Sequence, residues 1–223
     1  MSVAVHVPGR PVLAMAAAGG ARASAGLIPA IQDLLAQAGV PLGELDAIVF
    51  GRGPGSFTGL RTACAVAQGL GFGSGVPVLA LDTLLAVAED AHARTGATQV
   101  VAVLDARMGQ LYAAGYRRRG DAWETVAEPA LRDPADVTAP PGWVLAGTGL
   151  ELLDTRAERI EALPSAAALL RLAPAALAAA PAHPAAEALP LYLRDKVAQT
   201  TQEREAERAR KDNPGGGPAA GKR

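Results

Sequence analysis

The chain has 223 residues, 50% of them hydrophobic, and a formal net charge of -1 at pH 7. This length allows one large domain or two small ones with a sizeable core, and the charge excludes a global basic field that would attract nucleic acid. A single cysteine excludes an internal disulfide framework and fits a reducing compartment. The sequence offers neither a targeting segment nor a long enough apolar run for a membrane span, so we expect a cytoplasmic protein.

Apolar periodicity predicts alternating strands and helices in the first half of the chain. Short apolar runs on either side of Pro8-Gly9-Arg10 predict an amino-terminal hairpin. Strands that then alternate with helices are typical of a parallel α/β sheet. The predicted elements are strands 2–7 and 11–17, helix 24–38, strand 45–50, a helix from about 58 to 71, strand 76–81, helix 83–94 and strand 99–104.

A second, smaller α/β subdomain is predicted over residues 100–195, after a first subdomain over 1–99. Segment 110–116 alternates like a half-exposed strand, and 123–126 is expected to pair with it. The other predicted elements are strand 144–147, helix 165–172, an Ala/Pro linker at 174–190 and an apolar segment at 191–194 that returns to the body. Residues 196–223 form a charged tail that we expect to be disordered.

A glycine-rich stretch marks the junction between a predicted strand and a predicted helix. It runs from Gly51 to Arg61 and reads Gly-Arg-Gly-Pro-Gly-Ser-Phe-Thr-Gly-Leu-Arg. Its glycines permit positive φ and close approach, and Ser56 or Thr58 can cap the helix, so the loop is either an anion cradle or a contact surface. The Walker lysine is absent, the dinucleotide glycine spacing fails, and a nucleophile elbow would need glycines where Pro54 and Thr58 stand. Ser56 is therefore not expected to be an activated nucleophile.

Other groups with chemical potential are isolated along the sequence. Cys64 falls on the apolar face of a predicted helix without a nearby histidine, which predicts a buried structural thiol. Asp105 and Arg107 end a predicted strand, where they either hold a substrate or pair to fix a turn. The histidines lack the spacing of metal ligands, so no metal site is predicted. They are His6, His92 and His183.

Four sequence motifs resemble those of the bacterial TsaB (YeaZ) family and follow one another in the family's order. The resemblance spans residues 2 to about 202. The four motifs are the glycine-rich stretch, Ala-Gln-Gly-Leu before Val76-Pro-Val, Leu104-Asp-Ala-Arg-Met-Gly-Gln-Leu-Tyr, and Pro190-Leu-Tyr-Leu-Arg. The resemblance implies the α/β fold of the actin, sugar kinase and Hsp70 ATPase group (ribonuclease H-like), with two subdomains. The residues of the family-signature loop are Gly53, Pro54, Gly55, Ser56, Thr58, Gly59 and Arg61.

The resemblance also implies a role in tRNA modification. TsaB-like proteins are non-catalytic and act with TsaD, a relative of the same fold, and the ATPase TsaE. Together they support transfer of threonylcarbamoyl to N6 of the adenosine next to the anticodon (t6A) in ANN-decoding tRNAs. We therefore expect a heterodimer with TsaD, tRNA reached through the complex, and ATP used by the complex with no cofactor held by this chain. Homodimerisation and direct tRNA contact stay open.

Residues 81–90 add an argument against catalysis. In the catalytic relative the equivalent region carries a metal-binding histidine pair, which is absent here. The alternatives left open are an ATP-dependent enzyme of the same superfamily and a glycopeptidase-like hydrolase. The sequence lacks the evident nucleophile and base that a glycopeptidase-like hydrolase would need.

TsaB-like proteins pack their amino-terminal helices, here 24–38 and about 58–71, against the partner. The second helix is rich in alanine and glycine, which lets two helices approach closely. Each of these residues could instead lie in the core of this chain. We expect Ala67→Glu to weaken TsaD association while leaving the fold largely intact. The predicted contact residues are Leu27, Ile31, Leu34, Phe57, Leu60, Ala63, Ala67 and Leu70.

The amino end departs from the family pattern. Members begin with a strand of the type Ile-Leu-Ala-Leu-Asp-Thr, which is missing ahead of residues 2–7. That strand would lie in the middle of the sheet, so its loss should leave backbone groups unpaired at a cost of about 1 to 3 kcal/mol for each buried group. We expect either an upstream start or a compromised protein, which the intact mass of the native protein would decide. If the strand is missing, the chain also lacks the aspartate of that strand, which relatives use near nucleotide phosphates. ATP binding is then less expected.

Overall fold

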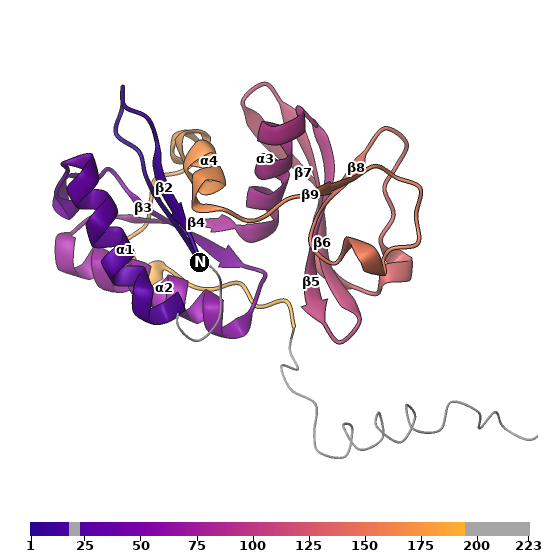
Figure 1. The fold of residues 1–223 in the computed structure, drawn as a ribbon, viewed down its shortest axis with the longest axis horizontal. Coiled ribbons are helices and arrows are strands. Elements are labelled where there is room, and N and C mark those ends of the chain that lie inside the picture. The colour runs from indigo at the N-terminus through magenta and orange to yellow at the C-terminus, as the bar shows by residue number, and fades with distance from the viewer. Residues whose placement is uncertain (18–22, 195–223) are drawn as a thin grey trace, which may run out of the picture. The chain divides into compact units, whose positions relative to one another are not determined.

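Strands β1 (Ser2–Val5) and β2 (Leu13–Ala16) form the predicted hairpin, in a computed structural model that describes residues 1–17 and 23–194 (Figure 1). Helix α1 (Ala23–Ala38) also follows the prediction. It packs on the hairpin because Leu34 and Ala38 lie on its apolar face and bury against Val5. The hairpin is a sheet of its own, with no further strand paired to it among the described residues.

Strands β3 (Ile48–Gly53) and β4 (Val78–Asp82) form a second, parallel sheet, connected through helix α2 (Phe57–Ser74). A 3-10 turn at Leu42–Glu44 delays the start of β3 beyond the predicted Leu45. Side chains alternate between the two faces of this sheet, as strand geometry requires. Phe50 and Val78 pack against Cys64 of α2, whereas Leu79 packs against Leu172 of helix α4 (Ala166–Ala179). The pair is therefore covered by a helix on each face.

Helix α3 (Thr83–Thr95) leads from β4 into a five-stranded sheet of order β7-β6-β5-β8-β9. Strand β5 (Gln99–Arg107) is central, parallel to β8 and antiparallel to β6, because tight turns reverse the chain between β5, β6 and β7. The sheet is thus mixed. The parallel pairing predicted for the first half of the chain is confirmed for β3 and β4, whereas β5 lies in this other sheet. The remaining strands are β6 (Gln110–Arg119), β7 (Ala122–Arg132), β8 (Val144–Gly147) and β9 (Arg159–Glu161).

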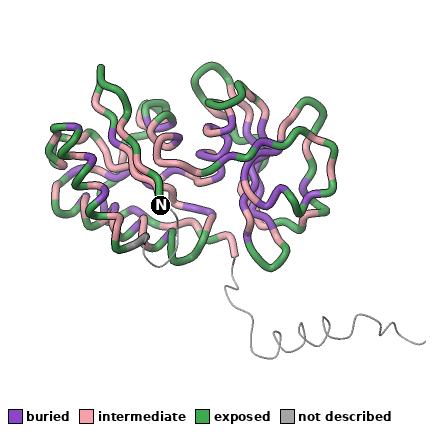
Figure 2. Tube along the Cα trace, viewed as in Figure 1, coloured by how far each residue is buried: buried purple, intermediate pink, exposed green. Residues whose placement is uncertain are grey.

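Strand β6 is buried where the sequence predicted half exposure. Tyr112 and Tyr116 pack toward α3, whereas Leu111 packs toward Leu150 and Leu153 on the opposite face. Figure 2 shows this buried region within the five-stranded sheet. Both faces are covered, so alternation in polarity was a poor guide to exposure.

The predicted linker at 174–190 is partly wrong, because α4 continues through Pro174 to Ala179. Alanine has the highest helix propensity, and the alanines on both sides of this proline favour continuation. Met1–Leu193 form one unit, and the subdomain boundary near residue 100 stays a prediction. The charged tail at 196–223 lies outside the described residues. Within the described part of the chain, none of the helices is both long and apolar enough to cross a bilayer.

Candidate functional site

The glycine-rich loop between β3 and α2 is held by hydrogen bonds from its own backbone. Ser56 is the N-cap of α2, and its hydroxyl oxygen accepts from the Gly59 N–H at 3.2 Å. A Cβ on Gly59 would lie 2.7 Å from that hydroxyl, so a larger residue here would displace the capping group. The Gly53 N–H donates to Thr83 Oγ1 at 3.0 Å, and the Gly53–Pro54 peptide bond is cis. Of the two capping candidates, the structure uses Ser56.

A segment from the far end of the chain, residues 188–193, lies along the loop and α2. We call this segment the strap. Leu191 N–H donates to the Arg52 carbonyl at 2.7 Å, and a Cβ on Gly53 would meet the Leu191 oxygen at 2.5 Å. The Ala188 carbonyl accepts from Cys64 Sγ at 3.2 Å and from Gln68 Nε2 at 2.9 Å. The predicted return of residues 191–194 to the body is confirmed for Leu191.

Phe57, Arg61 and Tyr192 form an exposed cluster where the strap crosses the start of α2. The Arg61 guanidinium carbon lies 4.0 Å from the centroid of the Phe57 ring, and Arg61 Nε donates to the Tyr192 hydroxyl at 3.0 Å. The two rings are 5.3 Å apart between centroids. Phe57 remains 38% exposed and Tyr192 42% exposed. The first and last blocks of the signature therefore meet and present aromatic surface to solvent.

Several donors of the loop are already engaged inside the chain. The amides of Gly53 and Gly59 already donate inside the chain, as does the Leu60 N–H to the Ser56 carbonyl at 2.9 Å. The two loop arginines are also engaged: Arg52 pairs with Asp82 at 2.6 Å, and Arg61 stacks on Phe57. A phosphate site needs amides and cations directed at the ligand. Of the two alternatives from the sequence, this geometry favours a contact surface.

The predicted partner residues mostly face inward. Leu34, Leu60 and Ala67 are buried in this chain, and Phe57 is exposed. Ala67 packs with Phe50 and Val78 in the core, where burial of a carboxylate is costly, so the structure argues against the expectation that Ala67→Glu leaves the fold largely intact. Whether any of the eight residues touches a partner stays a prediction. Six of them line one cavity of about 910 Å³: Leu27, Ile31, Leu60, Ala63, Ala67 and Leu70.

The structure also places Cys64, Asp105 and Arg107. Cys64 is buried as predicted, and burial raises the pKa of its thiol. Asp105 Oδ1 accepts from the Arg107 backbone N–H at 2.7 Å, and Oδ2 pairs with Arg107 Nη1 at 3.0 Å. Arg107 and Met108 both have positive φ in this β5–β6 turn. Asp105 and Arg107 therefore pair within the turn, which is the arrangement that the turn-fixing alternative requires.

The histidines lie apart. His92 bonds the Ala97 carbonyl through Nδ1 at 3.0 Å, and His183 lies 3.3 Å from Glu187. Over residues 1–17 and 23–194, no three His, Cys, Asp or Glu side chains gather as metal ligands. The absence of a metal site remains a prediction for the whole protein.

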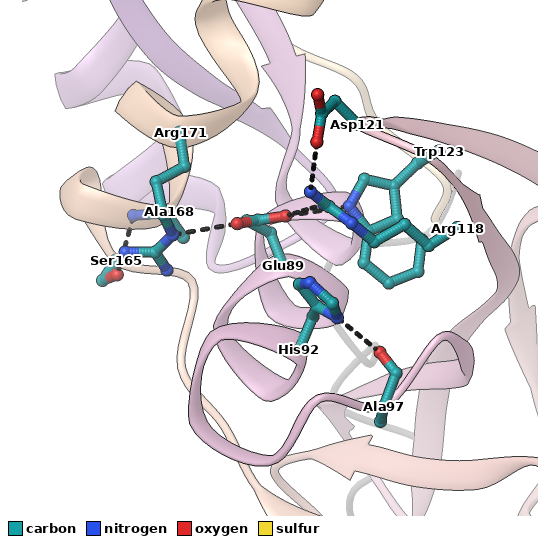
Figure 3. A network of polar contacts seen from close by, with 9 residues as sticks. All are labelled: Glu89, His92, Ala97, Arg118, Asp121, Trp123, Ser165, Ala168 and Arg171. Atoms are coloured by element: carbon teal, nitrogen blue, oxygen red, sulfur yellow. Dashed lines mark hydrogen bonds and ion pairs between the residues drawn. The ribbon is translucent and has the colours of Figure 1, made fainter.

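Glu89 anchors a buried polar network that the sequence analysis missed (Figure 3). Its Oε2 accepts from Arg118 Nη1 and Trp123 Nε1, both at 2.9 Å, and its Oε1 accepts from Arg171 Nε at 2.9 Å. The network joins α3 to β6, β7 and α4. A signal was present in the sequence, because Glu89 interrupts the apolar face formed by Leu85, Ala86 and neighbouring residues.

Residues 20–151 match the family model described as "TsaD: tRNA N6-adenosine threonylcarbamoyltransferase". Together with the α/β architecture, this match defines a protein of the TsaD-like group with the actin-like ATPase fold. The chain is 34% identical to "tRNA threonylcarbamoyladenosine biosynthesis protein TsaB" of Escherichia coli K12, over 77% of this chain and 80% of that protein. It is 33% identical to the Haemophilus influenzae protein of the same name, over 77% and 79% of the two chains.

Two solved structures from Pseudomonas aeruginosa agree with this match. One, named YeaZ, superposes with a TM-score of 0.80 at 39% identity and covers 86% of this chain and 93% of that chain. The other, described as similar to the peptidase YeaZ, superposes with a TM-score of 0.81 at 39% identity and covers 86% and 94%. The chain therefore belongs to the TsaB (YeaZ) family.

Proposed function

We propose that this chain is a non-catalytic subunit in t6A biosynthesis, which supports threonylcarbamoyl transfer to tRNA through a TsaD partner together with TsaE. The observation that carries the proposal is the 34% identity to E. coli TsaB across most of both chains. The internally bonded glycine loop supports the non-catalytic part, because its donors serve the strand-to-helix turn.

The partner surface in this proposal centres on the Phe57, Arg61 and Tyr192 cluster. Aromatic residues and arginine dominate the energetic centres of protein interfaces. Next to the cluster, the exposed face of α2 carries Ala65 and Gly69, whose small size allows a partner helix to approach closely.

Reconstituted tRNA modification tests the proposal. The chain is combined with TsaD, TsaE, ATP, tRNA and an enzyme that makes the threonylcarbamoyl adenylate, and t6A is measured by mass spectrometry of digested nucleosides. We expect t6A formation to depend on the chain, and Phe57→Ala with Arg61→Ala to weaken TsaD binding by roughly tenfold. Val126→Ala, at a 47% exposed position on β7, is the matched control and should change nothing.

Two results would overturn the proposal. The first is t6A formation that proceeds equally without the chain. The second is steady ATP hydrolysis by the chain alone, which would favour the ATP-dependent enzyme of the same superfamily.

A further inference from the structure

Arg61 is held in one orientation by the cluster that it forms with Phe57 and Tyr192. Its guanidinium carbon lies 4.0 Å from the centroid of the Phe57 ring and 6.0 Å from that of the Tyr192 ring. A guanidinium presents its N–H donors in a planar fork, and here Nε donates to the Tyr192 hydroxyl at 3.0 Å. Among residues 1–17 and 23–194, no acceptor pairs with Nη1 or Nη2, so the outer edge of the fork is open.

The surface beside Arg61 is a groove of about 280 Å³ between α2 and the strap. Two other polar side chains line it, and both already donate to the Ala188 carbonyl: Cys64 Sγ at 3.2 Å and Gln68 Nε2 at 2.9 Å. The rest of the lining is apolar and consists of Ala65, Ala188, Leu189 and Pro190. Arg61 thus carries the only charge among the described residues that line the groove.

An arginine in these surroundings needs a counter-charge once a partner covers it. Arginine stays protonated in proteins, so covering the cluster removes water from a permanent charge. Burial of a charge without a partner carries a large free-energy cost. A carboxylate offsets that cost most directly, because its two oxygens can accept two parallel hydrogen bonds from the open edge of the Arg61 fork.

A nucleic-acid phosphate has the same charge but fits this surface less well. Nucleic-acid binding draws its affinity from several cations that contact successive phosphates. The described lining of the groove adds no second cation to Arg61. Instead, Phe57, Leu189 and Tyr192 present apolar and aromatic surface that is 38%, 67% and 42% exposed. A fixed arginine among such residues is typical of the energetic centre of a protein interface.

We propose that Arg61 is the receptor for an Asp or Glu side chain of the TsaD partner. The partner's carboxylate binds Nη1 and Nη2 at the open edge of the guanidinium, and an apolar side chain next to it in the partner fills the groove beside Leu189. Phe57 and Tyr192 hold the guanidinium in place before the partner arrives, which lowers the entropic cost of forming the pair. This inference rests on the proposed function and adds the chemistry by which the partner is recognised.

Compensating charge reversal tests the proposal. The Kd for TsaD is measured by calorimetry for the full parent chain and for Arg61→Glu. Each surface Asp and Glu of TsaD is then changed to Arg, one at a time, and titrated against Arg61→Glu. We expect Arg61→Glu alone to weaken TsaD binding by roughly 30-fold or more, and one reversed TsaD residue to recover roughly tenfold of that loss. A purely structural role of Arg61 would not be rescued by a charge on the other protein.

Two further variants separate the charge of Arg61 from its packing. Arg61→Met keeps an aliphatic stem against Phe57 and removes the charge, and it replaces Arg61→Glu if that variant fails to fold. In a double-mutant cycle, its loss of affinity should not add to that of the TsaD variant in which the matching carboxylate is changed to an amide. Arg156→Glu, at an exposed position in the loop before β9, is the matched control and should leave the Kd unchanged.

Three outcomes would overturn the inference and leave the proposed function in place. The first is equal affinity of the parent chain and Arg61→Glu for TsaD. The second is a loss that no reversed TsaD residue recovers and that adds fully in the double-mutant cycle. The third is weaker tRNA binding by the complex with unchanged TsaD affinity, which would assign Arg61 to a phosphate. A parent chain that does not bind TsaD at all would instead overturn the proposed function, and the inference with it.

Discussion

Arg61 in α2 donates a hydrogen bond to the hydroxyl of Tyr192, 131 positions further along the chain, and stacks on the ring of Phe57. The contact joins the glycine loop to the strap. It also leaves both aromatic rings partly exposed. The surface proposed for partner binding is therefore built by residues that lie far apart in the sequence.

Tyr192→Ala should loosen the strap. It removes the ring contact with Phe57 and the hydrogen bond from Arg61, so we expect a loss of about 1 kcal/mol in the free energy of unfolding. Exchange of the Leu191 amide, which is bonded to Arg52, should accelerate. Tyr192→Phe keeps the ring and is the control, with a smaller loss. Unchanged Leu191 exchange in Tyr192→Ala would contradict the role given to this contact. Urea unfolding and amide exchange provide the measurements.

Glu89→Gln should be the more damaging of two carboxylate replacements. It removes the buried charge that Arg118 and Arg171 share, and those side chains are 17% and 40% exposed. We expect a loss of about 3 kcal/mol, at the lower end for a broken buried pair because the two arginines keep access to solvent. Glu124→Gln, whose partners Arg117 and Arg119 lie near solvent, should cost much less, because exposed ion pairs contribute little to stability. Equal losses in urea unfolding would refute a structural role for the Glu89 network.

Ala67→Glu and Ala65→Glu compare a core position with a surface position on the same helix. Ala67 is 3% exposed in the core, so a carboxylate there should cost more than about 3 kcal/mol and lower the melting temperature sharply. Ala65 is exposed on α2, and its replacement should change stability by about 0.5 kcal/mol at most. Thermal unfolding by circular dichroism measures both. A variant Ala67→Glu that melts like the parent chain would contradict the packing described for α2.

Tyr116→Phe should be neutral or stabilising by up to about 1 kcal/mol. The Tyr116 hydroxyl is buried and has no hydrogen-bond partner among the described residues, so its removal takes away an unpaired polar group. Destabilisation by more than that amount in urea unfolding at pH 8 would point to a hydrogen bond made by this hydroxyl.

The same variant predicts a pH effect. Burial raises the pKa of Tyr116, and the nearby charge of Asp82 raises it further. In the unfolded chain a tyrosine ionises at about pH 10, so the free energy of unfolding of the parent chain should fall as pH rises above that value. Tyr116→Phe lacks this component and should gain stability relative to the parent chain between about pH 9 and 11. A constant difference across this range would contradict it.

The order of strands and helices could be predicted because the buried elements carry apolar residues at strand or helix spacing. The role of the glycine loop could not. Whether its amides are available to a ligand depends on Thr83 and Leu191, and neither contact follows from spacing. Pro174 misled the assignment of α4 for a different reason: the cost of a proline inside a helix was outweighed by alanines and by packing on the sheet.

The strap also sets an order of events during synthesis. Arg52 and Arg61 leave the ribosome long before Leu191 and Tyr192, to which they bond. The strand, loop and helix of the signature can form early from local contacts, but the aromatic surface at the start of α2 is complete only when translation has passed Tyr192. A nascent chain that stalls before that point would carry the most recognisable part of the signature and still lack the finished surface.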